Sequence, residues 1–329
     1  MLASIEFRRF KALRHTRVDL APFNLVIGPN GSGKTSLIEA ISRLRTLSQL
    51  PLRTDTPPAQ RAEGPELEFH FAAPYAGTVA RLSCVSELVC DTLRVSTSGV
   101  AAWPQISAEL ATIRSYSLDH AAMARPSHRA DGFELKADGG NLAANLADMR
   151  RRAPESFAAL TAELLRMLPE FRALVVGEHP DGTVDFALDL EEDGVVPADE
   201  MSQGILYLVG VLALAFDPDP PRVLCIEEID RGIHPRMLRE VRDALYRLSY
   251  PESFGLARRP VQIVTTTHSP YFIDLFRDHP EEVIVSHKHG RAARFERLIE
   301  RPDLPELLRD GSLGDMWFSG ILGGVPEER

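Results

Sequence analysis

Residues 28–35 read Gly-Pro-Asn-Gly-Ser-Gly-Lys-Thr, a complete G-x-x-x-x-G-K-[ST] phosphate-binding loop, or P-loop. The residues on both sides support this reading. Residues 23–27 (Phe-Asn-Leu-Val-Ile) form a short β-prone run, and residues 36–44 have apolar side chains at helical spacing. A simple glycine turn before a helix is the structural alternative. The order of strand, glycine-rich loop and helix favours a phosphate site.

The loop offers groups that can bind the phosphates of a nucleotide and its Mg²⁺ ion. Its glycines let backbone N–H groups turn toward the phosphates, and the helix N-terminus adds partial positive charge. Lys34 is expected to reach the β- and γ-phosphates, and Thr35 to place its hydroxyl on Mg²⁺. The sequence therefore predicts binding of ATP and Mg²⁺, with nucleotide contacts from Gly28, Pro29, Asn30, Gly31, Ser32, Gly33, Lys34, Thr35 and Ser36.

The composition is that of a soluble globular protein. Of 329 residues, 44% are hydrophobic and 26% are charged. No apolar run reaches the roughly 18 residues needed to cross a membrane, and the N-terminus lacks the pattern of a signal peptide. Cys84, Cys90 and Cys225 have no metal-ligand spacing, and Cys225 is interpreted as a reduced core residue. These observations predict a cytoplasmic location and no membrane partner.

The net charge of −10 at pH 7 argues against the basic overall surface of many nucleic-acid binders. It does not exclude a local basic groove. Clusters such as residues 150–152 (Arg-Arg-Arg) and 8–9 (Arg-Arg) have a plainer interpretation as solvated charges at the ends of helices or strands. DNA is therefore kept as a candidate partner.

Hydrophobic periodicity predicts an α/β core interrupted by a largely helical insertion. Strands are expected at residues 1–7, 23–27, 67–71, 79–85, 92–95, 185–190, 222–226 and 261–266. Helices are expected at 36–44, 141–152, 155–168, 205–216 and 236–248, and a loop at 51–64. The chain is expected to form a single domain made of an N-terminal lobe (1–104), the insertion (105–200), a core segment (201–300) and a C-terminal tail (301–329).

Two carboxylates end the apolar run at residues 222–226. Glu227 and Glu228 follow it directly, which is a Walker B pattern. One carboxylate of such a pair orders Mg²⁺, directly or through water, and the next is placed to polarise an attacking water. Glu227 stands where many P-loop enzymes have Asp. Taken alone, a solvated strand end would look the same, and the P-loop favours the functional interpretation.

Two further stretches are candidates for contact with the γ-phosphate. His268 follows a β-branched strand and precedes Ser269-Pro270; a structural histidine is the alternative. The run Met201-Ser202-Gln203-Gly204 opens an apolar helix, with Ser202 as a natural N-cap and Gly204 leaving the backbone open. This run is either only a helix cap or an ABC signature, whose serine holds the γ-phosphate bound by another subunit.

Taken together and in this order, these stretches resemble the ABC-type ATPases related to SMC and RecF proteins, and most closely the OLD-like (overcoming lysogenization defect) branch. The resemblance covers nearly the whole chain. It rests on GPNGSGKTS at 28–36, MSQGIL at 201–206, IEEIDRGIHP at 226–235, TTHSPYFID at 266–274, and shorter matches at 10–13 (FKAL), 138–142 (DGGNL) and 313–317 (LGDMW). Gln203 departs from the family pattern, because it replaces the first glycine of LSGGQ. No Q-loop glutamine can be placed, since Gln49 and Gln60 lie in a poorly patterned loop.

The resemblance implies an α/β P-loop NTPase with a mixed sheet, the ABC-ATPase head. It implies an ATP-sandwich homodimer in which each nucleotide lies between the P-loop of one head and the Ser202 motif of the other. It also implies that Glu228 is the general base, that His268 senses the γ-phosphate, and that Glu227 and Thr35 bind Mg²⁺. OLD nucleases carry a TOPRIM domain after the ATPase, and the short stretch after residue 274 lacks one. A separate effector protein is therefore expected.

Two functions of different classes follow. The first is an ATPase that acts as a nucleotide-driven dimerisation switch in bacterial anti-phage defence or DNA maintenance, by analogy with the family. The second is a RecF-like clamp that binds DNA when ATP closes the dimer and hydrolyses slowly. A transporter ATPase subunit is disfavoured, because LSGGQ and a coupling groove are not visible.

Overall fold

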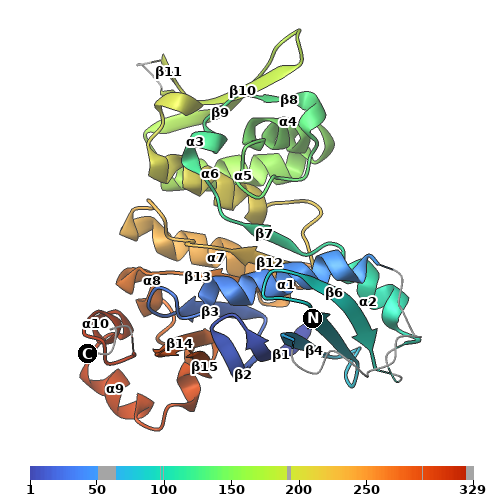
Figure 1. Cartoon of the computed structure of the whole chain (residues 1–329). Coiled ribbons are helices and arrows are strands. Elements are labelled where there is room, and N and C mark those ends of the chain that lie inside the picture. The colour runs from blue at the N-terminus through green and yellow to red at the C-terminus, as the bar shows by residue number, and fades with distance from the viewer. Residues whose placement is uncertain (51–63, 97, 99, 191–193, 291, 324–329) are drawn as a thin grey trace. The chain divides into compact units, whose positions relative to one another are not determined.

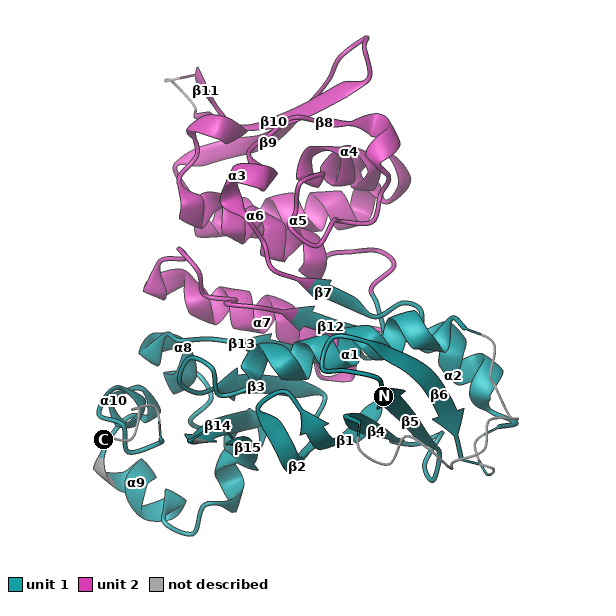
Figure 2. Cartoon of the chain, viewed as in Figure 1, with its two compact units in different colours: residues 1–115, 221–225, 260–329 teal, residues 116–220, 226–259 magenta. Residues whose placement is uncertain are grey.

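The computed structural model describes residues 1–50, 64–96, 98, 100–190, 194–290 and 292–323 (Figure 1). The expected loop at 51–64 lies almost wholly outside them. The chain divides into two compact units, shown in Figure 2. Unit 1 contains residues 1–115, 221–225 and 260–329, and unit 2 contains residues 116–220 and 226–259. This division cuts across the segments expected from the sequence, because each unit gathers stretches that are distant along the chain.

A mixed six-stranded sheet, in the order β15-β14-β3-β13-β12-β7, forms the centre of unit 1. Strand β3 is parallel to both β13 and β14, whereas β14 and β15 are antiparallel. All five residues of β3 are buried, as expected for a strand covered on both faces. The strands are β3 (Phe23–Ile27), β7 (Arg114–Tyr116), β12 (Val223–Ile226), β13 (Gln262–Thr266), β14 (Val283–His289) and β15 (Ala292–Arg297).

A second, antiparallel sheet of five strands has the order β2-β1-β4-β5-β6. Its strands are β1 (Leu2–Phe10), β2 (Leu13–Asp19), β4 (Glu66–Phe71), β5 (Val79–Cys84) and β6 (Cys90–Val95). Gln262 joins it to the first sheet, because its side-chain amide accepts from the N–H of Leu2 and donates to the carbonyl of Leu2. These bonds satisfy a fully buried amide, which would otherwise be costly.

Helix α1 (Lys34–Ser48) belongs to the hydrophobic core that joins these two sheets. Its apolar side chains are buried in one cluster with side chains from strands of both sheets. The other helices of unit 1 are α2 (Trp103–Leu110), α8 (Pro270–Asp274), α9 (Leu304–Asp310) and α10 (Leu313–Phe318). In the C-terminal tail, Gly314 donates its N–H to Asp274 at 2.7 Å and α10 buries Trp317, whereas Phe318 is 83% exposed. This part of the tail therefore packs on unit 1.

Unit 2 combines helices with a sheet of its own. Its helices are α3 (His120–Met123), α4 (Leu142–Arg152), α5 (Pro154–Met167), α6 (Gln203–Ala215) and α7 (Leu238–Ser249). Strand β10 (Thr183–Leu190) pairs with β8 (Ser127–His128), β9 (Phe171–Glu178) and β11 (Gly194–Pro197). The insertion expected to be largely helical thus also carries a sheet. Only β10 was anticipated, because Val184, Phe186 and Leu188 alternate clearly with less buried residues.

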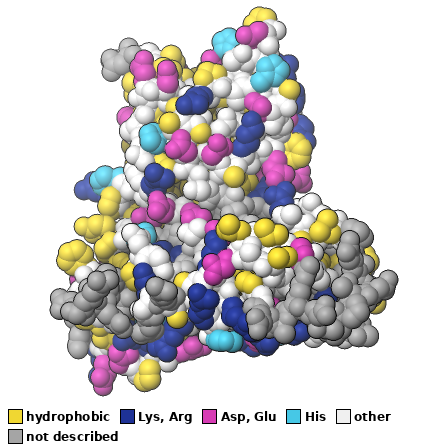
Figure 3. Space-filling model, in the orientation of Figure 1, with side chains coloured by type: hydrophobic (Ala, Val, Ile, Leu, Met, Phe, Trp, Pro, Cys, Tyr) yellow, Lys and Arg dark blue, Asp and Glu magenta, His cyan; other side chains and the backbone are white. Residues whose placement is uncertain are grey.

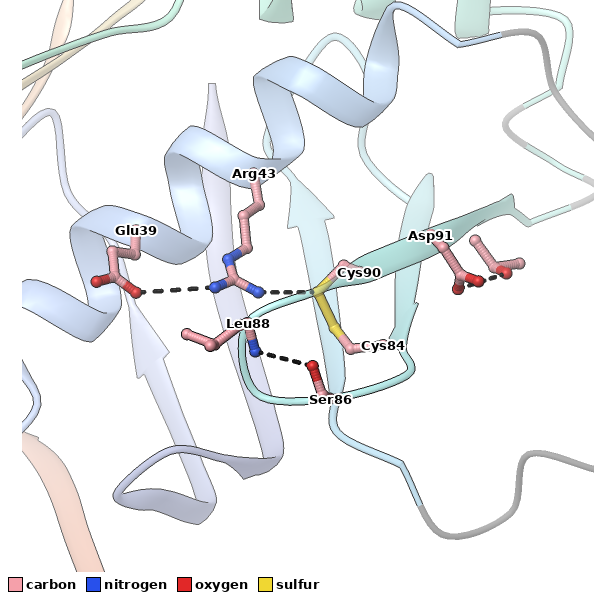
Figure 4. Close-up of a disulfide and its surroundings, with 8 residues drawn as sticks. Glu39, Arg43, Cys84, Ser86, Leu88, Cys90 and Asp91 are labelled. Carbon is pink, nitrogen blue, oxygen red and sulfur yellow. Dashed lines mark hydrogen bonds and ion pairs between the residues drawn. A yellow bond between two sulfur atoms is a disulfide. The ribbon is translucent and has the colours of Figure 1, made fainter.

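The cysteines differ from the expectation in one respect. Cys84 and Cys90 are joined by a disulfide between β5 and β6, which the sequence analysis did not anticipate (Figure 4). The two residues face each other in the register of this strand pair, so the pairing depends on a hairpin alignment that cysteine spacing does not reveal. Cys225 is free and buried, as expected. The cytoplasmic location stays a prediction.

Candidate nucleotide-binding site

The P-loop leaves β3 after Ile27 and enters α1 at Lys34. Gly31 (φ +73°) and Gly33 (φ +99°) adopt left-handed conformations that favour glycine. A Cβ on Gly33 would lie 2.8 Å from Cδ2 of Leu13, and one on Gly28 would lie 2.6 Å from the carbonyl oxygen of Ser286. Both the backbone angles and the close packing therefore require glycine in this loop.

The ammonium group of Lys34 points toward the backbone of the P-loop. The residue is only 9% exposed, and Nζ donates to the carbonyl oxygens of Gly28 at 2.6 Å and Pro29 at 3.1 Å. These bonds hold a buried positive charge beside the backbone of the P-loop. Charge-assisted hydrogen bonds from such a group to a phosphate would be stronger than neutral ones.

The N-terminus of α1 has the features of an anion site. Gly33 is its N-cap and provides no side-chain cap, and no acidic residue lies in the first turn. Among the described residues, the buried hydroxyl of Ser32 has no hydrogen-bond partner. Backbone N–H groups, the helix dipole and this hydroxyl together fit an anionic phosphate. Thr35 is exposed in the first turn of α1, whereas Ser36 is 9% exposed.

Strand β14 adds two residues to this loop that the sequence analysis missed. Ser286 donates its hydroxyl to the carbonyl oxygen of Ser32. A Cβ on Gly31 would lie 3.4 Å from Nζ of Lys288, which places a second cation beside the glycine-rich turn. The apolar run Val283–Val285 could have indicated a buried strand here. Its parallel pairing with β3, some 260 residues earlier, gives no local signal.

The other two motifs in the sheet follow strands close to β3. Strand β13 lies between β3 and β12 in the sheet order. His268 comes just after β13 and is exposed, and the next residue, Ser269, caps α8 by accepting from the N–H of Phe272. Glu227 and Glu228 come directly after β12. The sequence thus predicted correctly that each motif follows a strand.

Glu228 has an unusual backbone. Its φ of +50° is left-handed, which costs a residue other than glycine about 1–3 kcal/mol. Its side chain is 51% exposed and forms an ion pair with Arg231 at 3.8 Å. Glu227 is half-buried, and its N–H donates to the carbonyl oxygen of Tyr116. Backbone strain of this kind is concentrated at functional sites.

Ser202 and Gly204 lie at the start of α6 in unit 2. Ser202 is exposed and caps the helix by accepting from the N–H of Ile205 at 3.4 Å, as predicted. A Cβ on Gly204 would lie 2.3 Å from the carbonyl oxygen of Gly232, so glycine is required there by close backbone packing. One turn further along, burial raises the pKa of Tyr207, whose hydroxyl donates to the carbonyl of Leu118.

Two known protein families match this chain, one over residues 102–274 and the other over residues 1–81. The family described as "AAA domain, putative AbiEii toxin, Type IV TA system" matches residues 102–274, which is more than half of the chain. The chain belongs to this AAA family. The family described as "AAA ATPase domain" matches residues 1–81, which include the P-loop.

Individual proteins are also similar to this chain, over a part of it or over most of it. The DNA replication and repair protein RecF of Thermomicrobium roseum is 35% identical over 88 residues, which is 26% of this chain and 22% of RecF. The chain therefore matches only about a fifth of that relative's length. An SMC head bound to the C-terminal winged-helix domain of ScpA matches with a TM-score of 0.63 and 16% identity, over 90% of this chain and 96% of that one.

An SMC head of Pyrococcus furiosus matches with a TM-score of 0.59 and 15% identity, over 94% of this chain and 99% of that one. At these identities the structures establish the fold. The fold is therefore the one found in SMC heads and is consistent with a P-loop NTPase, which confirms the predicted fold class. None of the helices in the described ranges is both long and apolar enough to cross a membrane.

Proposed function

We propose that this chain binds and hydrolyses ATP with Mg²⁺. The observation that carries the proposal is the P-loop itself, in which a buried ammonium, a buried hydroxyl without a partner and an uncapped helix N-terminus surround one glycine-rich turn. Each of these features favours an anionic phosphate. The family match supports the same ligand.

In this proposal Lys34 holds the β- and γ-phosphates, while Thr35 and Glu227 supply oxygen ligands for Mg²⁺. The metal would neutralise charge that develops on the phosphates. Glu228 accepts a proton from the attacking water, and its half-exposed carboxylate has access to solvent. His268 donates to the γ-phosphate and so distinguishes ATP from ADP. The remaining loop residues, from Gly28 to Ser36, form the cradle through their backbone.

We further propose that ATP drives the association of two copies of the chain. Ser202 caps an exposed helix start, where N–H groups and the helix dipole favour phosphate. Gly204 keeps that helix start close to the Gly232 turn. Each Ser202 would bind the γ-phosphate held by the other copy, and closure would control a separate effector protein.

The motifs at 226–235 and 266–274 support an OLD-like role in anti-phage defence or DNA maintenance. The family description, which mentions a toxin–antitoxin system, supports a defence role too. The second candidate is an ATP-gated DNA clamp, which the similarity to RecF favours. Both acidic and basic side chains are present on the face of each unit that Figure 3 shows. Stimulation of ATP turnover by duplex DNA would favour the clamp, and its absence would favour the switch.

Replacement of Lys34 tests the proposed function. Lys34→Ala removes charge-assisted phosphate contacts worth about 1.5–3 kcal/mol, so ATP affinity should fall roughly 10- to 100-fold. Calorimetric titration with Mg-ATP measures this, and phosphate release measures turnover. Lys136→Ala is the matched control, because Lys136 is an exposed lysine of unit 2 that forms an ion pair with Asp131. Equal ATP affinity in Lys34→Ala and wild type would refute the assignment.

A further inference from the structure

Three side chains that commonly ligate metals, none of them part of the P-loop, meet on the five-stranded sheet of unit 1. Glu6 lies in β1, and Glu68 and His70 lie in β4. Their chain neighbours, among them Phe7 and Phe69, are fully buried in the core, so the three side chains occupy the other face of the sheet. Glu6 stands directly opposite Glu68 in the antiparallel register.

The imidazole of His70 points between the two carboxylates. Its Nε2 lies 3.3 Å from Oε1 of Glu68 and 3.6 Å from Oε1 of Glu6. Within the described parts of the chain this nitrogen is buried and has no hydrogen-bond partner, because neither contact has hydrogen-bond geometry. The three ligand atoms all lie within 4.8 Å of one another. A buried ring nitrogen in this position requires a bound proton or a metal ion to satisfy it.

Two arginines also contact these carboxylates. Arg81 donates to Oε2 of Glu68, which leaves Oε1 of that carboxylate directed toward His70. Arg17 forms its shorter contacts, 2.9 and 3.0 Å, with Asp19 and reaches Oε1 of Glu6 only at 3.3 Å. Like charges directly opposite each other in a sheet are destabilising. Arg17 and Arg81 offset part of the repulsion between Glu6 and Glu68, and a cation between the two carboxylates would lower it further.

We propose that Glu6, Glu68 and His70 form a zinc site that joins β1 to β4. Tetrahedral zinc with bonds of about 2.0–2.2 Å requires neighbouring ligand atoms about 3.3–3.6 Å apart, and both distances from Nε2 fall in this range. One imidazole and two carboxylates leave the fourth position for water. Imidazole ligation favours zinc over Mg²⁺ or Ca²⁺, which prefer oxygen ligands. The site is independent of the proposed nucleotide site.

Calorimetric titration of the full chain with Zn²⁺, without nucleotide or thiol reductant, tests the proposal. We expect one saturable site, and a rise in melting temperature on zinc addition. Loss of one ligand should weaken affinity by roughly 100-fold or more, since even loss of an outer-shell partner costs 10- to 100-fold. The variants are His70→Ala and Glu68→Gln.

Matched controls lie on the same sheet. His15→Ala removes an exposed histidine of β2, and Glu66→Gln removes a carboxylate of β4 that pairs with Arg8. Both controls should bind zinc as wild type does. Co²⁺ provides a second readout, because tetrahedral coordination gives it strong visible absorption that His70→Ala should abolish. If His70→Ala does not fold, Glu68→Gln and the Co²⁺ spectrum still decide the question. Absence of saturable zinc binding, or equal binding in wild type and Glu68→Gln, would overturn the proposal.

Discussion

Glu228 combines a left-handed backbone with a half-exposed carboxylate at the end of a buried strand. The family resemblance, rather than the position after an apolar run, implies that Glu228 is the general base, because the Walker B pattern alone does not distinguish it from Glu227. The structure separates them, because Glu227 continues the strand pairing through its N–H and Glu228 begins the turn. The roles of Glu228 as the base and of Glu227 as a metal ligand stay predictions.

Glu228→Gln should slow ATP turnover by roughly 100-fold or more, because Gln keeps the size of the side chain but cannot accept the proton. The melting temperature should change little, since the exposed ion pair with Arg231 contributes at most about 1 kcal/mol. Phosphate release measures the rate, and calorimetric titration checks that ATP still binds. Hydrolysis at the wild-type rate would show that the base lies elsewhere, with Glu227 as the next candidate.

Replacement of Lys288 tests whether this residue contributes to ATP binding. The side chain is exposed and its Nζ lies beside the Gly31 turn, so it can donate to a bound phosphate. Lys288→Ala should weaken ATP binding about tenfold, a loss of about 1.4 kcal/mol. Titration with Mg-ATP measures the affinity, with Lys136→Ala as the control. An unchanged affinity would mean that Lys288 does not contact the nucleotide.

At the scale of elements, local patterns predicted local structure well. The run at 23–27 became β3 with the expected bounds, and the helical spacing after Lys34 became α1. The sequence patterns could not predict which distant strands pair with each other. β14 lies beside β3 through contacts separated by about 260 residues, and these bring Ser286 to the P-loop. Only the structure therefore shows that Ser286 and Lys288 lie beside the P-loop.

The β5–β6 hairpin gives a prediction about stability. Its disulfide closes a short loop, with a sequence separation of 6, so chain-entropy arguments give it about 2 kcal/mol of stabilisation. Arg43 of α1 donates to the Cys90 sulfur at 3.4 Å (Figure 4). Urea unfolding of wild type with and without dithiothreitol measures the effect.

Wild type should unfold at a lower urea concentration when dithiothreitol reduces the disulfide. Cys84→Ser should unfold at that lower concentration with or without dithiothreitol, so it is the control for effects of the reductant elsewhere in the protein. Identical unfolding curves for oxidised and reduced wild type would show that the disulfide does not contribute.

At the scale of the whole molecule, the sequence predicted the fold class because its motifs occur in a fixed order along the chain. The division into units was harder to foresee. The first three residues of strand β12 belong to unit 1, whereas Ile226 and the residues that follow it belong to unit 2 with the Ser202 helix. Each unit is thus assembled from segments that are far apart in sequence, and hydrophobic periodicity carries no information about such long-range assembly.

We propose that ATP joins two copies of this chain through Ser202. The most direct measurement is the molar mass by light scattering of Glu228→Gln, with and without Mg-ATP. We expect a monomer without nucleotide and a dimer with it. Adding Ser202→Arg should keep the chain monomeric, because the larger side chain would clash with the nucleotide of the other copy. A dimer that forms equally well with Ser202→Arg, or no dimer at all with ATP, would contradict the account.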